Sequence, residues 1–177
     1  MSEGEGAGVA QAFREAFRAH PAGVAVVTAD VGGGPVGFTA TSVASLSIEP
    51  PLLVFSVVSS SSSAPAIARA ESVVVHLLDS EHLGLAKLFS TSGVDRFADR
   101  SSWSRLPTGE PYLPSARWLR GSVASLLPLG GSSLVVVQVN AVGPSIPGES
   151  GKGARPDPLV YHDRTWHAIG ERSLLGD

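Results

Sequence analysis

Two clusters of hydroxyl side chains are the residues of this sequence best suited to bind a ligand. One cluster is Thr39-Ala40-Thr41-Ser42, and the other is the serine run Ser59–Ser63. Each lies at or just after the end of an apolar stretch, so both are expected where a strand gives way to a turn. Short hydroxyl groups and the free N–H groups of a turn can hold a phosphate without a metal ion. A buried phosphate also needs a cation, for which Arg96 and Arg100 are candidates. The alternative is that the serine run is a solvated turn.

Several other kinds of active site lack their required residues. The chain has no cysteine, which excludes disulfides, thiolate metal ligands and thiol catalysis. No Gly-x-Ser-x-Gly segment indicates a serine hydrolase. No two of the five histidines have the i, i+4 spacing of a helical zinc site. His162 and His167 could meet across a hairpin, and His76 lies in an apolar stretch typical of a core or an interface. We therefore predict no metal ligand and no acid–base catalytic residue.

Length and composition indicate one soluble domain. The chain has 177 residues, and 16% of them are charged, against about 25% in typical soluble domains. This low fraction of charged residues suggests that part of the surface is buried against another subunit. The net charge of −3 argues against binding of nucleic acid or anionic lipid. Because the chain has neither a secretory signal nor a long apolar run, we expect it in the cytoplasm and not in a membrane.

The elements that must position these residues are mostly short strands. Phe13 and Phe17 share one face of a helix expected over Ala10–Ala19, and a second helix is expected over Ser80–Phe89 with Ser80 as its N-cap. Residues 1–9 are expected to be a disordered tail, residues 10–170 the domain, and residues 171–177 a second tail. The expected strands are Val24–Thr28, Val36–Thr41, Leu52–Val58, Ser72–Leu78, Ala116–Leu127, Leu134–Val142, Leu159–His162 and Thr165–Ile169. Pro128-Leu129-Gly130-Gly131 and Asp163-Arg164 are expected as turns, and 143–157 as an exposed loop. This order favours an antiparallel barrel over an alternating βαβ sheet.

Whole segments of the chain, in order, resemble the flavin reductase-like, FMN-binding split-barrel family. The resemblance covers about residues 10–170. Its segments are Phe13-Arg14 with His20-Pro21-Ala22-Gly23-Val24, Pro35–Ser42, Leu46–Leu53, Ser60–Ser63, Asp95-Arg96-Phe97 with Trp103, Gly109 and Pro111, and Asp157–Tyr161 with Trp166-His167.

The resemblance implies a mainly β fold, a six-stranded antiparallel Greek-key split barrel with a few short helices. It also implies a homodimer that holds FMN, rather than FAD, in a groove at the subunit interface. By position, Thr39, Ala40, Thr41 and Ser42 would line the flavin ring and ribityl chain. Ser60, Ser61, Ser62 and Ser63 would bind the phosphate, with Phe89 and Arg96 near the flavin.

The function that this resemblance implies is an NAD(P)H-dependent flavin reductase that passes a hydride to flavin N5, with reduced flavin delivered to a partner monooxygenase. Hydride transfer needs no protein acid or base, which agrees with the absence of a catalytic pair. Two departures from the family pattern weaken the inference that the protein oxidises NAD(P)H. Gly131-Ser132 stands where many members have Asp-His, and Ser59 stands where many have a basic residue. The alternatives are an FMN-binding carrier or sensor without NAD(P)H turnover, and an oxidase of another small substrate.

Overall fold

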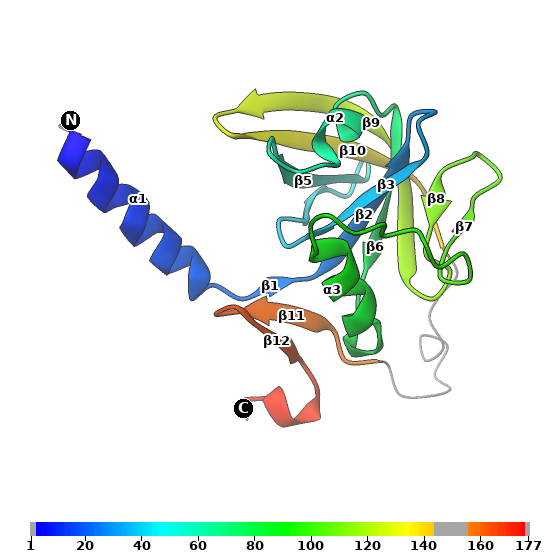
Figure 1. Ribbon diagram of the computed structural model, residues 1–177. Helices are drawn as coiled ribbons and strands as arrows, with labels where there is room; N and C mark the ends of the chain where they lie inside the picture. Colours follow the sequence, from blue (N-terminus) through cyan, green and yellow to red (C-terminus); the bar gives the residue numbers. More distant parts are fainter. Residues whose placement is uncertain (1–2, 144–155, 176–177) are drawn as a thin grey trace.

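The computed structural model describes residues 3–143 and 156–175, and its main feature is one curled antiparallel sheet of seven strands (Figure 1). The strand order is β3-β2-β6-β9-β10-β5-β4. The strands are β2 (Ala25–Asp30), β3 (Pro35–Ala40), β4 (Ala44–Ser47), β5 (Leu52–Val58), β6 (Ser72–Leu77), β9 (Arg117–Leu129) and β10 (Ser132–Val142). The predicted mainly β, antiparallel barrel fold is confirmed as a curled half-barrel sheet, with seven strands instead of the six expected. The seventh strand, β4, escaped prediction because it is only four residues long and mostly exposed.

Smaller elements surround this sheet. A three-stranded sheet contains β1 (Ala22–Gly23), β11 (Leu159–His162) and β12 (Thr165–Ala168), and a ribbon pairs β7 (Ser104–Arg105) with β8 (Pro111–Tyr112). The helical segments are α1 (Glu3–Arg18), α2 (Ala64–Ile67), η1 (Ser80–His82), α3 (Leu83–Ser90) and η2 (Glu171–Ser173). The β11–β12 hairpin and its Asp163-Arg164 turn were predicted correctly.

Two apolar cores lie on opposite faces of β2. Val27 packs with Phe55 and Val75 inside the curl of the sheet, whereas Val26 packs on the other face with Phe89 beneath α3. Successive strand residues point to opposite faces, so the continuous apolar run Ala25–Val27 lets β2 serve both cores. This double burial holds β3 and α3 against β2, and these two elements border the candidate site.

Several sequence expectations need correction at element ends. The first helix begins at Glu3 instead of Ala10, so most of the stretch expected to be a disordered tail is helical. Once a helical turn has formed, each further residue adds a hydrogen bond at little cost, so the helix extends backwards from its Phe-bearing end. The second helix is a 3₁₀ turn followed by α3. Its N-cap is Asp79, whose carboxylate accepts a hydrogen bond from the Glu81 N–H at 3.0 Å, rather than Ser80.

The turn between the two long strands is also shorter than expected. Pro128 and Leu129 belong to β9, which leaves Gly130 and Gly131 as the turn. Gly130 has φ +59°, a conformation that glycine adopts without steric cost. Most of the loop expected at 143–157 lies outside the described residues. Among residues 3–143 and 156–175, no helix is long and apolar enough to cross a membrane.

Candidate functional site

The hydroxyl clusters meet in one groove beside β3. The groove has a volume of about 570 Å³. It contains every predicted site residue except Ser63, together with six positions that the sequence interpretation missed. The lining residues are Phe38, Thr39, Ala40, Thr41, Ser42, Ser56, Val58, Ser60, Ser61, Ser62, Phe89, Ser90, Ser92, Gly93 and Arg96. The groove brings together residues of β3, of the loop that leads to α2, of the end of α3 and of the loop that follows α3. These residues are spread over about 60 positions of the sequence.

The groove follows the edge strand β3, which ends the sheet. The carbonyl of Gly37 points away from β2, because it accepts hydrogen bonds from Arg96 Nη1 at 2.8 Å and from Ser63 Oγ at 2.9 Å. In an antiparallel strand, residues two apart turn their backbone groups to the same side. Thr39 therefore directs its backbone N–H and C=O groups toward this open edge, and Thr41 follows directly after the end of the strand at Ala40. An edge of this kind can contact the polar rim of a flat ring.

Ser42 fastens the end of β3 to β5. Its Oγ accepts a hydrogen bond from the Ser56 N–H at 2.9 Å and donates one to the Ser56 carbonyl at 3.2 Å. The hydroxyl of Thr39 is also used within the protein, because it donates to the Ala86 carbonyl of α3 at 2.7 Å. These two hydroxyl groups hold the groove walls, and Thr41 between them is exposed.

The serine run forms the turn between β5 and α2. Within the described part of the chain, the backbone N–H groups of Ser60 and Ser62 have no hydrogen-bond partner. The Ser61 hydroxyl accepts a weak bond from the Ser63 N–H at 3.3 Å, which shapes the turn. Two free N–H groups beside three hydroxyls form a concave donor set suited to an anion.

Ser63 stands apart from its neighbours. It is 1% exposed, does not line the groove, and binds the Gly37 carbonyl from behind. Its expected role as a phosphate ligand is therefore not supported by its position. The apolar residue Ile67 follows it in the short helix α2, and folding this segment inward buries the last serine of the run.

Arg96 supplies the cation of the groove. Its Nη1 lies 3.5 Å from Ser62 Oγ, and its Nε and Nη2 donate to the Thr91 carbonyl at 3.2 and 2.8 Å. Burial lowers the pKa of this guanidinium from its ordinary value, but arginine stays protonated at neutral pH. The other candidate, Arg100, lies elsewhere: its guanidinium carbon is 5.0 Å from the centroid of the Trp103 ring.

Phe89 closes the groove from α3. It is 1% exposed and packs edge-to-face on Phe97, with ring centroids 5.2 Å apart. Gly37 has to be glycine here, because a Cβ at that position would lie 2.7 Å from a Phe89 ring carbon and 2.9 Å from the Val27 carbonyl oxygen. The ring therefore rests directly on the β3 backbone.

The groove residues that sequence interpretation missed include Ser90, Ser92 and Gly93. They belong to a second hydroxyl-rich stretch, Ser90-Thr91-Ser92-Gly93, directly after α3. The signal was available in the same form as the serine run, a cluster of small polar residues at the end of an apolar element. Only the packing of α3 on β3 makes it part of the same site.

The histidines do not form a metal centre in the part of the chain that the structure describes. No group of three or more possible ligands occurs there. His162 and His167 do meet across the β11–β12 hairpin, with ring centroids 5.7 Å apart. His76 is a core residue, as expected: its Nδ1 bonds the Val26 carbonyl and its Nε2 accepts from the Leu113 N–H, both at 3.0 Å. Burial lowers the pKa of His76 to about 4.

The Gly131-Ser132 position lies outside the groove but contacts the start of the serine run. The Gly131 carbonyl accepts a hydrogen bond from the Ser59 N–H at 2.9 Å. The β9–β10 turn therefore supports the base of the serine run within the same protomer.

Comparison with known proteins identifies the family. The profile of the flavin reductase like domain matches residues 17–170. The chain is 46% identical over 156 residues to an NADH:FMN oxidoreductase of Rhodococcus qingshengii, covering 88% of this chain and 79% of that protein. It is 35% identical over 133 residues to the reductase subunit Stc3 of stachydrine N-demethylase from Rhizobium meliloti, covering 74% and 57% of the two chains.

A solved structure agrees with these sequence matches. The crystal structure of a flavin reductase domain protein from Arthrobacter sp. FB24 superposes with a TM-score of 0.80 at 37% identity, covering 90% of this chain and 95% of that one. These matches confirm the family resemblance that was based on several segments in the same order along the sequence. The chain belongs to the flavin reductase like domain family.

Proposed function

We propose that this protein is an NADH-dependent FMN reductase. The observation that carries the proposal is the groove beside β3, which gathers nine of the ten predicted flavin-binding residues in a chain closely similar to an NADH:FMN oxidoreductase. Two free backbone N–H groups, three hydroxyls and one arginine at one end of the groove match a phosphate monoester. This favours FMN over riboflavin as the flavin bound.

The residues present fit the proposed cofactor. Ser60, Ser61 and Ser62 would hold the phosphate, with Arg96 compensating its charge. The backbone edge at Thr39 and Thr41 would face the polar rim of the isoalloxazine, and Phe89 would support the apolar part from α3. Neutral hydroxyl and N–H donors with a single arginine give moderate affinity, which suits a flavin that binds and leaves.

When bound, FMN supplies a ring that accepts two electrons as a hydride from the dihydronicotinamide C4 of NADH. The contribution of this chain is to bind, align and shield the two rings, because hydride transfer requires no proton donor at the reacting atoms. Backbone N–H groups at the β3 edge would stabilise negative charge on the reduced flavin. The neutral state of His76 keeps it out of this chemistry, since both of its ring nitrogens are used in the core.

The functional unit that we propose is a homodimer. Support comes from large apolar side chains left exposed in the single chain, among them Phe13 at 60%, Phe17 at 61% and Ile48 at 87%. The helix α1 that bears the two phenylalanines projects away from the rest of the molecule (Figure 1). Light scattering during size exclusion gives the mass directly, and a monomer at micromolar concentration would contradict the proposal.

We further propose that reduced flavin passes to a partner monooxygenase in the cytoplasm. The support is the similarity to a reductase subunit of an N-demethylase. The test is delivery: the reductase and a candidate oxygenase are held on opposite sides of a dialysis membrane, and product formation then depends on diffusing flavin alone.

The experiment that tests the reductase function follows NADH oxidation by the purified chain with FMN, riboflavin or no added flavin. Catalysed loss of NADH absorbance that depends on added flavin supports the proposal. Flavin binding without NADH consumption above the protein-free background would instead support the carrier or sensor alternative.

A further inference from the structure

The guanidinium of Arg96 is held mainly by backbone carbonyls. Its Nε and Nη2 donate to the Thr91 carbonyl at 3.2 and 2.8 Å, and its Nη1 donates to the Gly37 carbonyl at 2.8 Å. Its contacts with the hydroxyls of Ser62 and Ser63 are longer, at 3.5 and 3.4 Å. Among residues 3–143 and 156–175, no carboxylate forms an ion pair with it. Its positive charge is therefore available for an anion in the groove.

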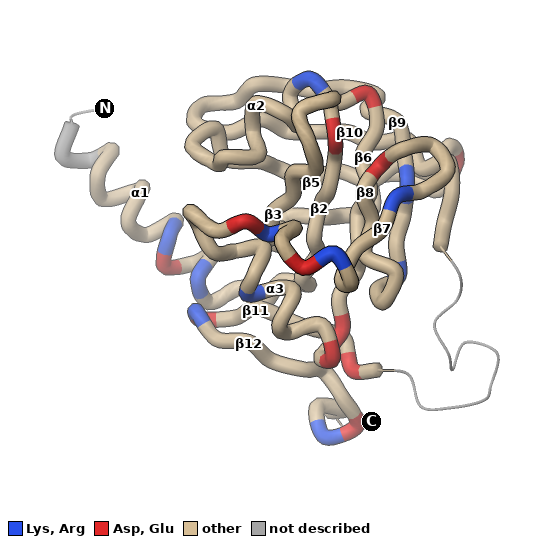
Figure 2. The backbone as a smooth tube through the Cα atoms, turned by 45° about the vertical axis from the view of Figure 1, so that its right-hand side comes forward, with Lys and Arg blue, Asp and Glu red and all other residues tan. Residues whose placement is uncertain are grey.

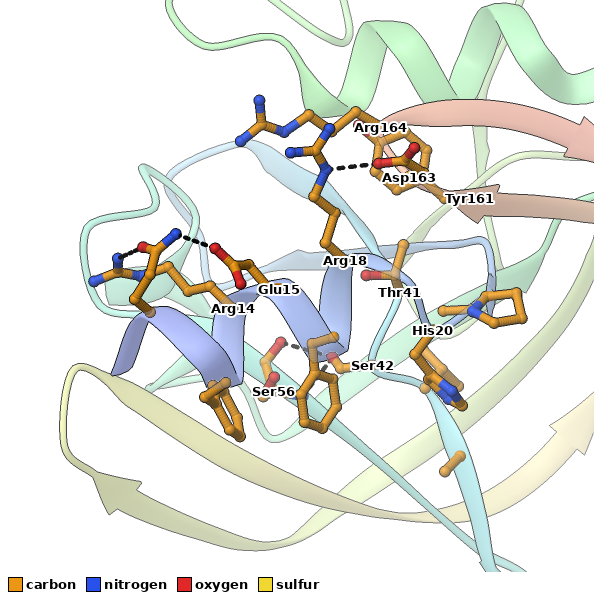
Figure 3. A pocket seen from close by; sticks show the side chains of 18 residues that line it. Arg14, Glu15, Arg18, His20, Thr41, Ser42, Ser56, Tyr161, Asp163 and Arg164 are labelled. Carbon is orange, nitrogen blue, oxygen red and sulfur yellow. Dashed lines mark hydrogen bonds and ion pairs between the residues drawn. The ribbon is translucent and has the colours of Figure 1, made fainter. Parts of the chain in front are cut away.

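The groove depends on this one side chain for its positive charge. Figure 2 shows the Lys and Arg positions spread along the chain and interspersed with Asp and Glu. Figure 3 shows the arginines of another pocket, beside α1, where Arg18 Nε is 2.6 Å from Asp163 Oδ1. Among the described residues that line the groove, Arg96 is the only cation. The placing of its guanidinium therefore decides how the groove meets the charge of a phosphate.

Thr91 ends α3 and presents its carbonyl to Arg96. It is the C-cap of the helix, with an extended backbone at φ −81° and ψ 131°. Its hydroxyl donates to the Lys87 carbonyl, four residues earlier, at 2.8 Å, and its N–H donates to the Leu88 carbonyl at 3.2 Å. A threonine hydroxyl makes such a bond to the preceding helical turn readily. These two bonds anchor Thr91 to α3, while its own carbonyl accepts both bonds from Arg96.

Thr91 itself does not line the groove, although Ser90 and Ser92 on either side of it do. Its hydroxyl can therefore influence a ligand only through what it holds in place. A long arginine side chain has several rotatable bonds, and ordering it when a ligand binds lowers the affinity. An arginine that is already ordered in the free protein avoids this loss. The bonds that fix Arg96 before a ligand arrives are thus relevant to binding.

We propose that Thr91 is a positioning residue of the groove, which orders Arg96 for the phosphate of the flavin. The inference rests on the proposed function, because the phosphate is that of FMN. The Thr91 hydroxyl fixes the end of α3, and the Thr91 carbonyl then fixes two nitrogens of the guanidinium. These bonds do not use every N–H of the guanidinium, so a phosphate at the serine run can still accept from it.

The test compares Thr91→Val, which keeps the shape of the side chain without its hydroxyl, with Thr91→Ser, which keeps the hydroxyl. Thr91→Val should raise the Kd for FMN roughly fivefold, the effect of an arginine that must be ordered on binding, with the Kd for riboflavin within about twofold. Thr91→Ser should stay within about twofold of the wild type for both flavins. Ser102→Ala is the matched control, because it removes a hydroxyl bond to a backbone carbonyl, that of Asp99 at 2.8 Å, outside the groove. It should match the wild type.

A double-mutant cycle with Arg96→Gln shows whether the effect passes through the arginine. Arg96→Gln weakens FMN binding by itself, and adding Thr91→Val should then change the Kd for FMN by less than about twofold. A further loss of roughly fivefold in the double variant would overturn the inference. An unchanged Kd for FMN in Thr91→Val would overturn it as well. An equal loss with riboflavin would also do so, since it would show that the groove wall moved.

Flavin binding is measured by fluorescence titration without NADH, which separates this inference from the reductase function. If Thr91→Val weakens FMN binding alone but the wild type oxidises no NADH, the positioning role stands and the reductase proposal fails. If the wild type reduces FMN with NADH and Thr91→Val binds FMN as tightly as the wild type, only the positioning role fails. A wild-type chain that binds no FMN would refute both.

Discussion

Removing the hydroxyl groups of Ser60 and Ser62 should weaken FMN binding and leave riboflavin binding unchanged. Both residues line the groove, and neither hydroxyl is the sole partner of a protein group. Among the described residues, the Ser60 hydroxyl makes no hydrogen bond, and the Ser62 hydroxyl has only a long contact with Arg96 Nη1 at 3.5 Å. The double substitution Ser60→Ala/Ser62→Ala therefore changes the ligand site with little effect on folding.

The magnitude follows from the type of contact. A hydrogen bond to a charged group contributes about 1.5–3 kcal/mol, and an open, water-filled groove places each of these nearer about 1 kcal/mol. Two such contacts amount to about 2 kcal/mol, or roughly a thirtyfold rise in the Kd for FMN. The backbone N–H groups of both residues remain, so binding is weakened and not abolished.

The assay is flavin fluorescence quenching on titration with protein, for FMN and riboflavin in parallel. Ser59→Ala is the matched control, since it makes the same chemical change one residue outside the groove and keeps the backbone bond to Gly131. Ser63→Ala is a second control, expected to reduce stability because its buried hydroxyl supports Gly37. If FMN and riboflavin weaken equally, or if FMN affinity does not change, the serine run is not the phosphate site.

Three further changes test the walls of the site and the core. Gly37→Ala should lower the free energy of unfolding by about 1–3 kcal/mol and weaken FMN binding, because the new methyl group displaces Phe89; Gly33→Ala, in open space, should do neither in urea melts and FMN titrations. Ser42→Ala should cost about 1 kcal/mol in the same urea melts through the lost bonds to β5, and no loss would show that water replaces them. The free energy of unfolding should fall by up to about 3 kcal/mol as the pH drops from 6.5 through 4, because His76 is protonated in the unfolded chain while its pKa in the native protein is about 4. His76→Gln should reduce this dependence of stability on pH. If the dependence does not change in the variant, other groups cause it.

Much of the fold followed from local pattern alone. Apolar runs such as Leu52–Val58 indicate strands, and Asp163-Arg164 between two short apolar stretches indicates a hairpin turn. These signals depend on neighbours in the chain, so sequence is sufficient to detect them. The hydroxyl clusters were visible for the same reason, since each ends an apolar strand.

Other features of the site depend on contacts between segments that lie far apart in the sequence, so local pattern could not reveal them. Residue types alone left Arg96 and Arg100 equivalent, and only the family resemblance favoured Arg96. In the structure, Arg96 is the arginine that reaches the Gly37 carbonyl, 59 positions away along the chain. Ser63 is equivalent to its neighbours in sequence but is buried by the inward turn at α2. The strand β4 is only four residues long and mostly exposed, and it pairs with the edge that β5 offers. Residues of the same type, whether serines, arginines or strand residues, therefore have different roles in the folded protein. Burial and the presence of a hydrogen-bond partner, rather than residue type, decide which of them remain free to bind a ligand.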